Sequence, residues 1–520
     1  MRNLILVVLA LSLGLVSCVQ PTRSPDPFLT PVIIVHSNDI HGRAWPFLRE
    51  DGKWVGGYAA QARLISEIRK EAEEKNAALL VLSAGDVNTG VPESDFSEAR
   101  PDFESMKAIG YDAMVVGNHD FDHGVDLLLK QLSWVKFPFL AANIKLKSTK
   151  QPLFPSDLMI ARQGIHFGVL GVTTDQLSRL ILSEHANQLL VENGIEAASR
   201  IAKKLKREGG EVLIALSHLG ISQSGLSIHR HIPNDDRQLA QKAPELDLIV
   251  GGHSHTFIKE GLKEGNALIV QSGYRGDYVG RVDLLWDKQK KQILTRKAQL
   301  VEVDPADGED LEIKKLVLPY KEKYEKELGV PVFESKRVIL GQRNQTHNLE
   351  IPLGNLVCDA LRGETQTDIA FFNSGGIRSS LPAGTVLRRD VLEAFPFKNR
   401  VSTGIVKGRH LVELLNDGLH EGNYAGGVLQ VSGLSYEIKG GKVTSVKVGG
   451  KKINPDKDYT FSTNSYVSSG GDKLKSILKA RSVKNGTQSI DEVLIQYASK
   501  LKLVDSDIES RINLKDPLNP

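Results

Sequence analysis

Short apolar runs alternate with amphipathic stretches along the chain from Val32 to about residue 300. This alternation predicts strands and helices that follow one another, which is typical of an α/β domain, here over residues 31–303. Between Tyr58 and Lys75 the apolar side chains recur at helical spacing. We therefore expect an amphipathic helix there, with one face packed on the domain core.

The composition changes near residues 304–332, where lysine and glutamate become frequent while apolar side chains keep a helical period. This stretch predicts a connector helix, which Pro319 is expected to kink or restart. A second domain is expected over residues 333–514. Helices are predicted near residues 353–363 and 408–419, and two Gly-Gly pairs within 434–461 predict a hairpin or meander.

The first 18 residues have the pattern of an export signal. One arginine precedes 13 almost purely apolar residues, from Leu4 to Val16, which is too short for a membrane span of about 20 residues and fits a signal peptide over residues 1–17. The end, Leu15-Val16-Ser17-Cys18, resembles a bacterial lipobox. We expect lipid on Cys18, a tether over residues 18–30 and a location in the cell envelope, facing the periplasm or the cell surface. The alternative is an ordinary secretory signal with a chance cysteine.

Charge and cysteine usage exclude several classes of protein. The 66 basic and 63 acidic side chains leave a net charge of +3, too balanced to indicate nucleic-acid binding. No later apolar run is long enough to span a membrane, so the only membrane contact expected is through the lipid. With two cysteines in all, neither a disulfide scaffold nor a thiolate metal site is expected. If Cys18 carries lipid, Cys358 has no partner.

Five predicted strands each end in Asp, Asn or His next to small residues. The five ends are Asn38-Asp39-Ile40-His41-Gly42, Ala84-Gly85-Asp86, Gly117-Asn118-His119-Asp120, Ser217-His218 and Gly252-His253-Ser254-His255. Each motif alone is more often a hydrogen-bonded turn than a ligand. Because ligands bind at the carboxyl ends of the strands in α/β sheets, the five together predict one converging metal site.

The number of ligand side chains indicates two divalent cations. The expected ligands are Asp39, His41, Asp86, Asn118, His218, His253 and His255. Carboxylate and imidazole ligands without thiolate suit zinc, manganese or iron. Two such cations about 3.5–4 Å apart are the usual device for in-line attack on a phosphoryl group.

The order of these motifs resembles the calcineurin-like metallophosphoesterases, and more closely the bacterial 5′-nucleotidases and UDP-sugar hydrolases. The resemblance implies a four-layer α/β/β/α sandwich followed by a smaller C-terminal α/β nucleotide-binding domain. It implies that Asp86 bridges the two cations and that His119 is catalytic, with Asp122 as its orienting partner. One cation would be held by Asp39, His41, Asp86 and His255, and the other by Asp86, Asn118, His218 and His253. Asp120 stands where many relatives have Glu, and no ligand role is expected for it.

Four motifs in the second half of the chain resemble the C-terminal domain of the same family. They are Glu350-Ile351-Pro352-Leu353-Gly354-Asn355, Asn373-Ser374-Gly375-Gly376-Ile377-Arg378, Phe395-Pro396-Phe397-Lys398-Asn399 and Ser469-Gly470-Gly471-Asp472. The resemblance implies that Asn373 and Arg378 contact the substrate, that Tyr466 stacks on the base and that Asp472 binds the ribose. Taken without context, the arginine after a Gly-Gly turn is better explained as a solvated side chain on a structural turn. The chain departs from the family pattern at two positions, where Val428 replaces an aromatic residue and His347 an arginine.

Together these features predict an exported two-metal phosphoesterase that hydrolyses nucleotide phosphate esters by attack of a metal-bound hydroxide. The alternative is a related hydrolase of 2′,3′-cyclic nucleotides, UDP-sugars or another phosphorus or sulfur ester. A binding protein without catalysis is disfavoured because all seven ligands are present. A serine hydrolase is disfavoured because Gly252-His253-Ser254-His255-Thr256 lacks the closing glycine of a nucleophile elbow.

Overall fold

The computed structural model describes residues 27–49, 51–222, 232, 234–341, 349–397, 399–419 and 427–515. The predicted signal peptide, Cys18, most of the predicted tether and His347 lie outside these residues. Among the helices of the described ranges, none combines the length and the apolar character that crossing a membrane requires.

The N-terminal domain contains two six-stranded sheets. The first has the order β16 (Gln292–Glu302), β15 (Tyr278–Asp287), β1 (Leu29–Ser37), β4 (Ala78–Ser83), β5 (Ala113–Val115), β6 (Phe139–Leu140). The second has the order β13 (Leu262–Glu264), β14 (Ala267–Val270), β12 (Leu248–Gly251), β11 (Val212–His218), β9 (Ile165–Thr173), β8 (Asp157–Arg162). In both sheets the central strands run parallel.

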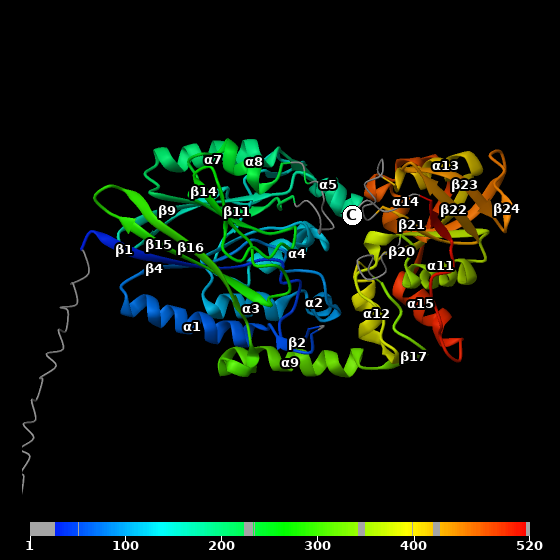
Figure 1. Ribbon diagram of the computed structural model, residues 1–520, viewed down its shortest axis with the longest axis horizontal. Coiled ribbons are helices and arrows are strands. Elements are labelled where there is room, and N and C mark those ends of the chain that lie inside the picture. The colour runs from blue at the N-terminus through cyan, green and yellow to red at the C-terminus, as the bar shows by residue number, and fades with distance from the viewer. Residues whose placement is uncertain are drawn as a thin grey trace, which may run out of the picture.

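Helices cover the outer face of each sheet, so that the domain has four layers (Figure 1). On one side lie α1 (Tyr58–Glu74), α2 (Pro92–Ser97), α3 (Arg100–Ile109) and α4 (Gly124–Leu132), and on the other α7 (Gly194–Arg207) and α8 (Asp236–Lys242). The two faces of β1 are both apolar, which explains why each sheet is covered on both sides. Ile33 and Val35 pack under the helices, whereas Val32 and Ile34 pack between the sheets. The predicted α/β/β/α sandwich is confirmed, as is the amphipathic helix expected from Tyr58.

The connector is the helix α9 (Leu311–Leu328), which runs below the N-terminal domain toward the second domain (Figure 1). It continues through Pro319, so the helix does not restart there. Pro319 has no N–H for the carbonyl of Lys315, but both residues are exposed, and water can hydrogen-bond to that carbonyl.

The second domain contains a five-stranded sheet and a four-stranded sheet. The first has the order β21 (Leu429–Ser432), β18 (Ile369–Asn373), β25 (Asp458–Asn464), β20 (Arg400–Lys407), β26 (Arg481–Ser489), and the second the order β24 (Lys451–Lys452), β23 (Lys442–Val448), β22 (Leu434–Lys439), β27 (Ile512–Leu514). β17 (Pro331–Ser335) pairs with β19 (Gly384–Leu387). The predicted hairpin is β22–β23, which turns at Gly440 and Gly441.

Helices pack on both faces of the five-stranded sheet. They are α11 (Pro352–Thr365), α12 (Arg388–Ala394), α13 (Gly408–Asp417), α14 (Ser465–Ser468) and α15 (Ile490–Ser499). Alternate residues of β18 divide between two cores, with Phe372 in the one that contains α11 and Phe371 in the one that contains α13. The two helices expected near residues 353–363 and 408–419 are confirmed as α11 and α13.

Candidate dimetal centre

The five predicted strand ends meet at one place, at the carboxyl edge of both sheets of the N-terminal domain. Asp39 and His41 follow β1, and Asp86 follows β4 in the same sheet. His218 ends β11 and His253 follows β12 in the facing sheet. The site is therefore assembled across the two sheets, and each ligand is placed by the turn that ends its strand.

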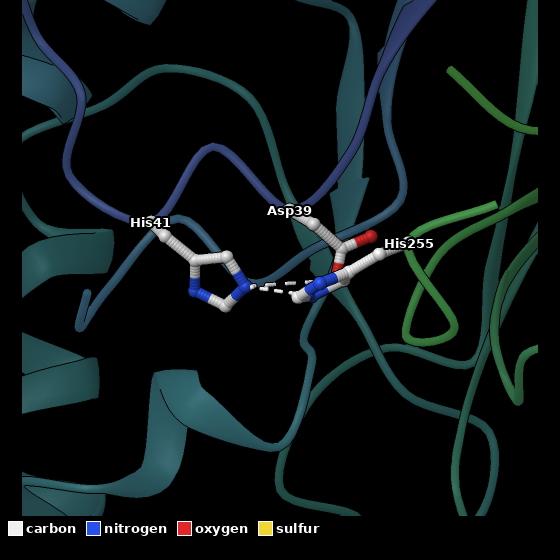
Figure 2. Close-up of side chains that lie close together, drawn as sticks. All are labelled: Asp39, His41 and His255. Atoms are coloured by element: carbon white, nitrogen blue, oxygen red, sulfur yellow. Dashed lines mark hydrogen bonds and ion pairs between the residues drawn. The ribbon is translucent and has the colours of Figure 1, made fainter. Parts of the chain in front are cut away.

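The first cluster consists of Asp39, His41 and His255, which turn toward one another in Figure 2. The Nε2 atoms of His41 and His255 lie 3.0 Å apart. Asp39 Oδ1 lies 3.4 Å from His255 Nε2 and 3.9 Å from His41 Nε2. Three donor atoms converge on one point, as the ligands of a cation do.

The second cluster consists of Asp86, His218 and His253. His218 Nε2 lies 3.0 Å from Asp86 Oδ2, and His253 Nδ1 lies 2.7 Å from Asn118 Oδ1. His218 Nε2 is also 4.0 Å from Asp39 Oδ1, an atom of the first cluster. The structure thus brings all seven predicted ligand side chains together in two adjoining groups.

The donor atoms of these clusters fit two divalent cations. His218 Nδ1 donates to the Ala84 carbonyl oxygen at 2.6 Å, and His41 Nδ1 donates to the Thr89 carbonyl oxygen at 2.7 Å. Each of these hydrogen bonds fixes the tautomer whose Nε2 lone pair faces its cluster, which is the usual support for a metal-binding histidine. With the carboxylates of Asp39 and Asp86, this donor set suits cations of the zinc, manganese or iron type.

The backbone is strained at these positions. Asp39, His41, Asp86, His253 and His255 have φ angles of +52°, +54°, +53°, +73° and +54°. A left-handed conformation costs a non-glycine residue about 1–2 kcal/mol. Strain of this kind is concentrated at functional sites, and here it falls on five of the seven predicted ligands.

Two glycines allow the close approach of the ligand loops. A Cβ atom at Gly117 would lie 2.1 Å from Asp86 Oδ1, and one at Gly252 would lie 2.9 Å from His218 Nδ1. A side chain at either position would displace a ligand, which explains the small residues in these motifs.

The electrostatics of the site depend on the balance between burial and the two carboxylates. Burial lowers the pKa of both His41 and His255 to about 3, so both rings are neutral at pH 7, as metal ligands must be. Burial also lowers the pKa of His218, but the charge and hydrogen bond of Asp86 outweigh it and raise this pKa to about 10. Asp86 therefore creates a strongly negative potential at His218 Nε2, which favours a cation.

His119 lies beside the clusters without belonging to either. Its Nδ1 is 2.7 Å from Asp122 Oδ2, and its backbone N–H donates to Asp86 Oδ1 at 2.8 Å. Burial lowers the pKa of His119, yet the negative charges of Asp122 and Asp86 raise it above its ordinary value overall. The imidazole is thus held in place and can carry a proton toward the site.

Three of the four predicted substrate residues of the second domain form one hydrogen-bonded group. Asn373 Nδ2 donates to Asp472 Oδ2 at 2.7 Å. Tyr466 Oη lies 3.2 Å from Asp472 Oδ1 and donates to the carbonyl oxygen of Arg179, in the N-terminal domain, at 2.9 Å. Val428 is fully buried in the core of the second domain, so it does not offer a surface to a base.

Arg378 reaches the N-terminal domain. Its guanidinium Cζ lies 5.7 Å from the centroid of the Phe397 ring, which stacks on His119 with the ring centroids 6.0 Å apart. The positive charge of Arg378 lowers the pKa of His119 and of His255. The second domain therefore places a cationic side chain beside the candidate dimetal centre.

The sequence did not reveal the role of Asp120. Its carboxylate accepts the backbone N–H of the predicted ligand Asp86 at 3.1 Å and that of Gly117 at 2.8 Å. It also accepts the N–H groups of Val87 and Asn88, both at 3.1 Å. The only sequence signal for this role is that Asp120 lies two residues after the predicted ligand Asn118, within Gly117-Asn118-His119-Asp120.

Comparison with known proteins agrees with this geometry. Residues 33–257 match the calcineurin-like phosphoesterase family, and residues 332–479 match the 5′-nucleotidase C-terminal domain family. The chain is 32% identical over 520 residues to a 5′-nucleotidase of Vibrio vulnificus, covering 91% of this chain and 92% of the relative. It is 31% identical over 514 residues to the protein UshA of Escherichia coli, covering 92% of each.

Solved structures show the same fold. The crystal structure of a 5′-nucleotidase precursor from Thermus thermophilus has a TM-score of 0.81 at 27% identity, covering 93% of this chain and 99% of that one. The sulfate thiohydrolase SoxB of the same genus has a TM-score of 0.74 at 18% identity, covering 93% and 96%, and shares the fold. The predicted family is confirmed: the chain belongs to the 5′-nucleotidase/UshA family of metallophosphoesterases.

Proposed function

We propose that this protein hydrolyses the phosphate ester of nucleotides. The observation that carries this proposal is the position of Arg378 of the nucleotidase-type C-terminal domain beside two His/Asp clusters of the N-terminal domain. A phosphate ester whose phosphorus lies at the clusters would extend its nucleoside toward the second domain. The relatives named 5′-nucleotidase support a 5′-nucleotide as the substrate.

In this proposal Asp39, His41 and His255 would hold one cation, and Asn118, His218 and His253 would hold the other. Asp86 would serve both, since its Oδ2 faces His218 while its charge also acts on His41. When bound, two such cations supply an acidified water and neutralise the phosphoryl oxygens. The surrounding residues orient the ligands and bind the substrate.

His119 donates a hydrogen bond to the negative charge that develops on phosphoryl or leaving-group oxygens. Asp122 orients the ring through Nδ1, so that Nε2 carries the proton toward the substrate. The stacked Phe397 covers the ring from the second domain and limits the access of water. His119 and Asp122 are therefore the proposed catalytic pair.

The second domain binds the rest of the nucleotide. Arg378 contacts phosphoryl oxygens, for which its planar guanidinium is suited. Asp472, held by Asn373, accepts hydrogen bonds from ribose hydroxyls, and the ring of Tyr466 stacks on the base. With Val428 buried, the stack is one-sided, which predicts broad base specificity.

We further propose that the protein acts outside the cytoplasm, attached by a lipid on Cys18. The support is the apolar stretch from Leu4 to Val16 and the lipobox-like Leu15-Val16-Ser17-Cys18. Radiolabelled palmitate incorporated into the wild-type chain and absent from Cys18→Ala is the expected result. Equal labelling of both would contradict lipidation at this cysteine.

A substrate panel tests the proposed reaction. The metal-loaded protein is assayed for kcat/KM on AMP, UMP, 2′,3′-cyclic AMP, UDP-glucose and a sulfate ester. The proposal expects the highest kcat/KM on the 5′-monophosphates. A preference of tenfold or more for any other member would replace it with that alternative.

A further inference from the structure

The loop between β14 and β15 carries an arginine whose backbone is strained. Arg275 has a φ angle of +62°, which is uncommon outside glycine and asparagine. Its backbone N–H donates to the carbonyl oxygen of Asp39 at 2.7 Å. The conformation of Arg275 is thus tied directly to a predicted metal ligand, and strain at such a position indicates a functional constraint.

A column of stacked groups leads from Arg275 to the dimetal centre. The ring of Tyr274 stacks on His255 with the centroids 4.9 Å apart and the planes 4° from parallel. The guanidinium Cζ of Arg275 lies 4.9 Å from the centroid of the same Tyr274 ring. The guanidinium is therefore held one ring away from a side chain of the first cluster.

In the part of the chain that the structure describes, no carboxylate forms an ion pair with the Arg275 side chain. Burial raises the pKa of the nearest acidic residue in sequence, Asp277, which lies close enough for the charge of Arg275 to oppose this rise, but its Oδ2 forms its ion pair with Nη1 of Arg49, at 3.9 Å. Arg275 also faces a like charge: burial lowers the pKa of Arg378, the positive charge of Arg275 lowers it further, and nearby carboxylates, those of Asp122, Asp86 and Asp472, oppose the shift only in part. Two guanidinium groups from different domains repel each other, and an anion bound near both would relieve this repulsion.

We propose that Arg275 is a substrate-binding residue that, together with Arg378, binds the phosphoryl oxygens from the side of the N-terminal domain. The inference rests on the proposed function, in which a phosphate ester is the substrate. Two guanidinium groups beside two cations favour a substrate with two negative charges. Arg275 therefore contributes to the preference for phosphomonoesters, which are dianions, over diesters, which carry one charge.

The test replaces Arg275 with asparagine, which accepts a positive φ and so does not endanger the fold. Arg275→Lys keeps the charge without the planar geometry, and Arg162→Gln removes one positive charge from the exposed outer strand β8 as a matched control. Each metal-loaded variant is measured for the Kd of inorganic phosphate by calorimetry. Turnover is compared between 4-nitrophenyl phosphate and bis(4-nitrophenyl) phosphate, which share a leaving group.

We expect Arg275→Asn to raise the Kd of phosphate about 10- to 100-fold, the usual effect of losing a hydrogen bond between charged groups. We also expect kcat/KM to fall more for the monoester than for the diester, with metal content and Tm unchanged, while Arg275→Lys gives an intermediate effect. An unchanged phosphate Kd, an equal fall for both esters, or a loss of metal or Tm would overturn the proposal.

Failure of the proposed function gives a different result. If wild-type protein binds phosphate more tightly than Arg275→Asn but hydrolyses no phosphate ester, the proposed reaction is wrong and the anion site at Arg275 is supported. If wild-type protein hydrolyses the monoester and Arg275→Asn behaves like Arg162→Gln, the reaction stands and the role of Arg275 is wrong.

Discussion

The buried carboxylate of Asp120 holds together two loops that carry predicted metal ligands, and this predicts a large effect of removing its charge. Oδ1 accepts the N–H groups of Val87 and Asn88, and Oδ2 accepts those of Asp86 and Gly117. Burial and the charge of Asp86 raise the pKa of Asp120 to about 6, which leaves it ionised at pH 7. In Asp120→Asn one oxygen becomes an NH₂ group, so two buried N–H groups face a donor.

Leaving a buried donor unsatisfied costs about 1–3 kcal/mol. Two such donors predict a loss of about 2–6 kcal/mol from the free energy of unfolding, a large part of the 5–15 kcal/mol typical of a folded domain. Because the two donors belong to loops that carry Asp86 and Asn118, metal content should fall as well. Asp120→Glu, which retains two acceptor oxygens, should lose less.

The assay is urea unfolding of metal-loaded protein, together with metal content by mass spectrometry. Asp126→Asn is the matched control, since Asp126 is exposed in the first turn of α4 and undergoes the same chemical change. Unfolding free energies of Asp120→Asn and Asp126→Asn within about 0.5 kcal/mol of each other, the usual range of surface substitutions, together with equal metal content, would show that Asp120 does not hold these loops.

Three further predictions concern other buried or catalytic groups. Burial lowers the pKa of His36 to about 3, so the unfolded chain takes up a proton below pH 6.5 while the folded chain does not. His36 should therefore contribute a fall of about 1.4 kcal/mol per unit to the free energy of unfolding as the pH drops from 6.5 toward 4. His36→Gln should reduce the slope in urea unfolding by this amount and leave the part due to His41 and His255, whose pKa is also lowered to about 3; an unchanged slope would contradict the assignment to His36. Asp122→Asn should lower kcat for AMP by about 10- to 100-fold, because His119 loses a charge-assisted hydrogen bond; a fall no larger than that of Asp126→Asn would argue against the pair. Tyr466→Ala should raise KM for AMP about 5- to 100-fold, since stacking on a base is worth about 1–3 kcal/mol. It should raise KM for 4-nitrophenyl phosphate less, because this substrate has no base. Equal increases in the two KM values would argue against stacking.

The clustering of the proposed metal ligands could be predicted because the position of each is encoded locally. A buried strand followed by a small residue and an Asp, Asn or His fixes where the strand ends and which side chain stands there. The parallel order of β1, β4 and β5 then brings three such ends to one edge. The facing sheet adds His218 by the same rule.

The contacts between distant segments could not be predicted in this way. The hydrogen bond from Tyr466 to the carbonyl of Arg179 joins residues 287 positions apart and depends on how the domains sit together. The hydrogen bonds of Asp120 go to backbone amides, which any residue can supply. The uninterrupted helix at Pro319 depends on the exposure of one carbonyl, which a sequence pattern does not reveal.

The central claim is that two cations at the clustered Asp and His side chains are needed for hydrolysis of a nucleotide ester. Its most direct test is to strip the protein of metal with a chelator, return zinc, manganese or iron in measured amounts, and follow phosphate release from AMP. We expect no turnover without metal and a plateau at two equivalents per chain. Turnover by metal-free protein, or a plateau at one equivalent, would contradict the claim.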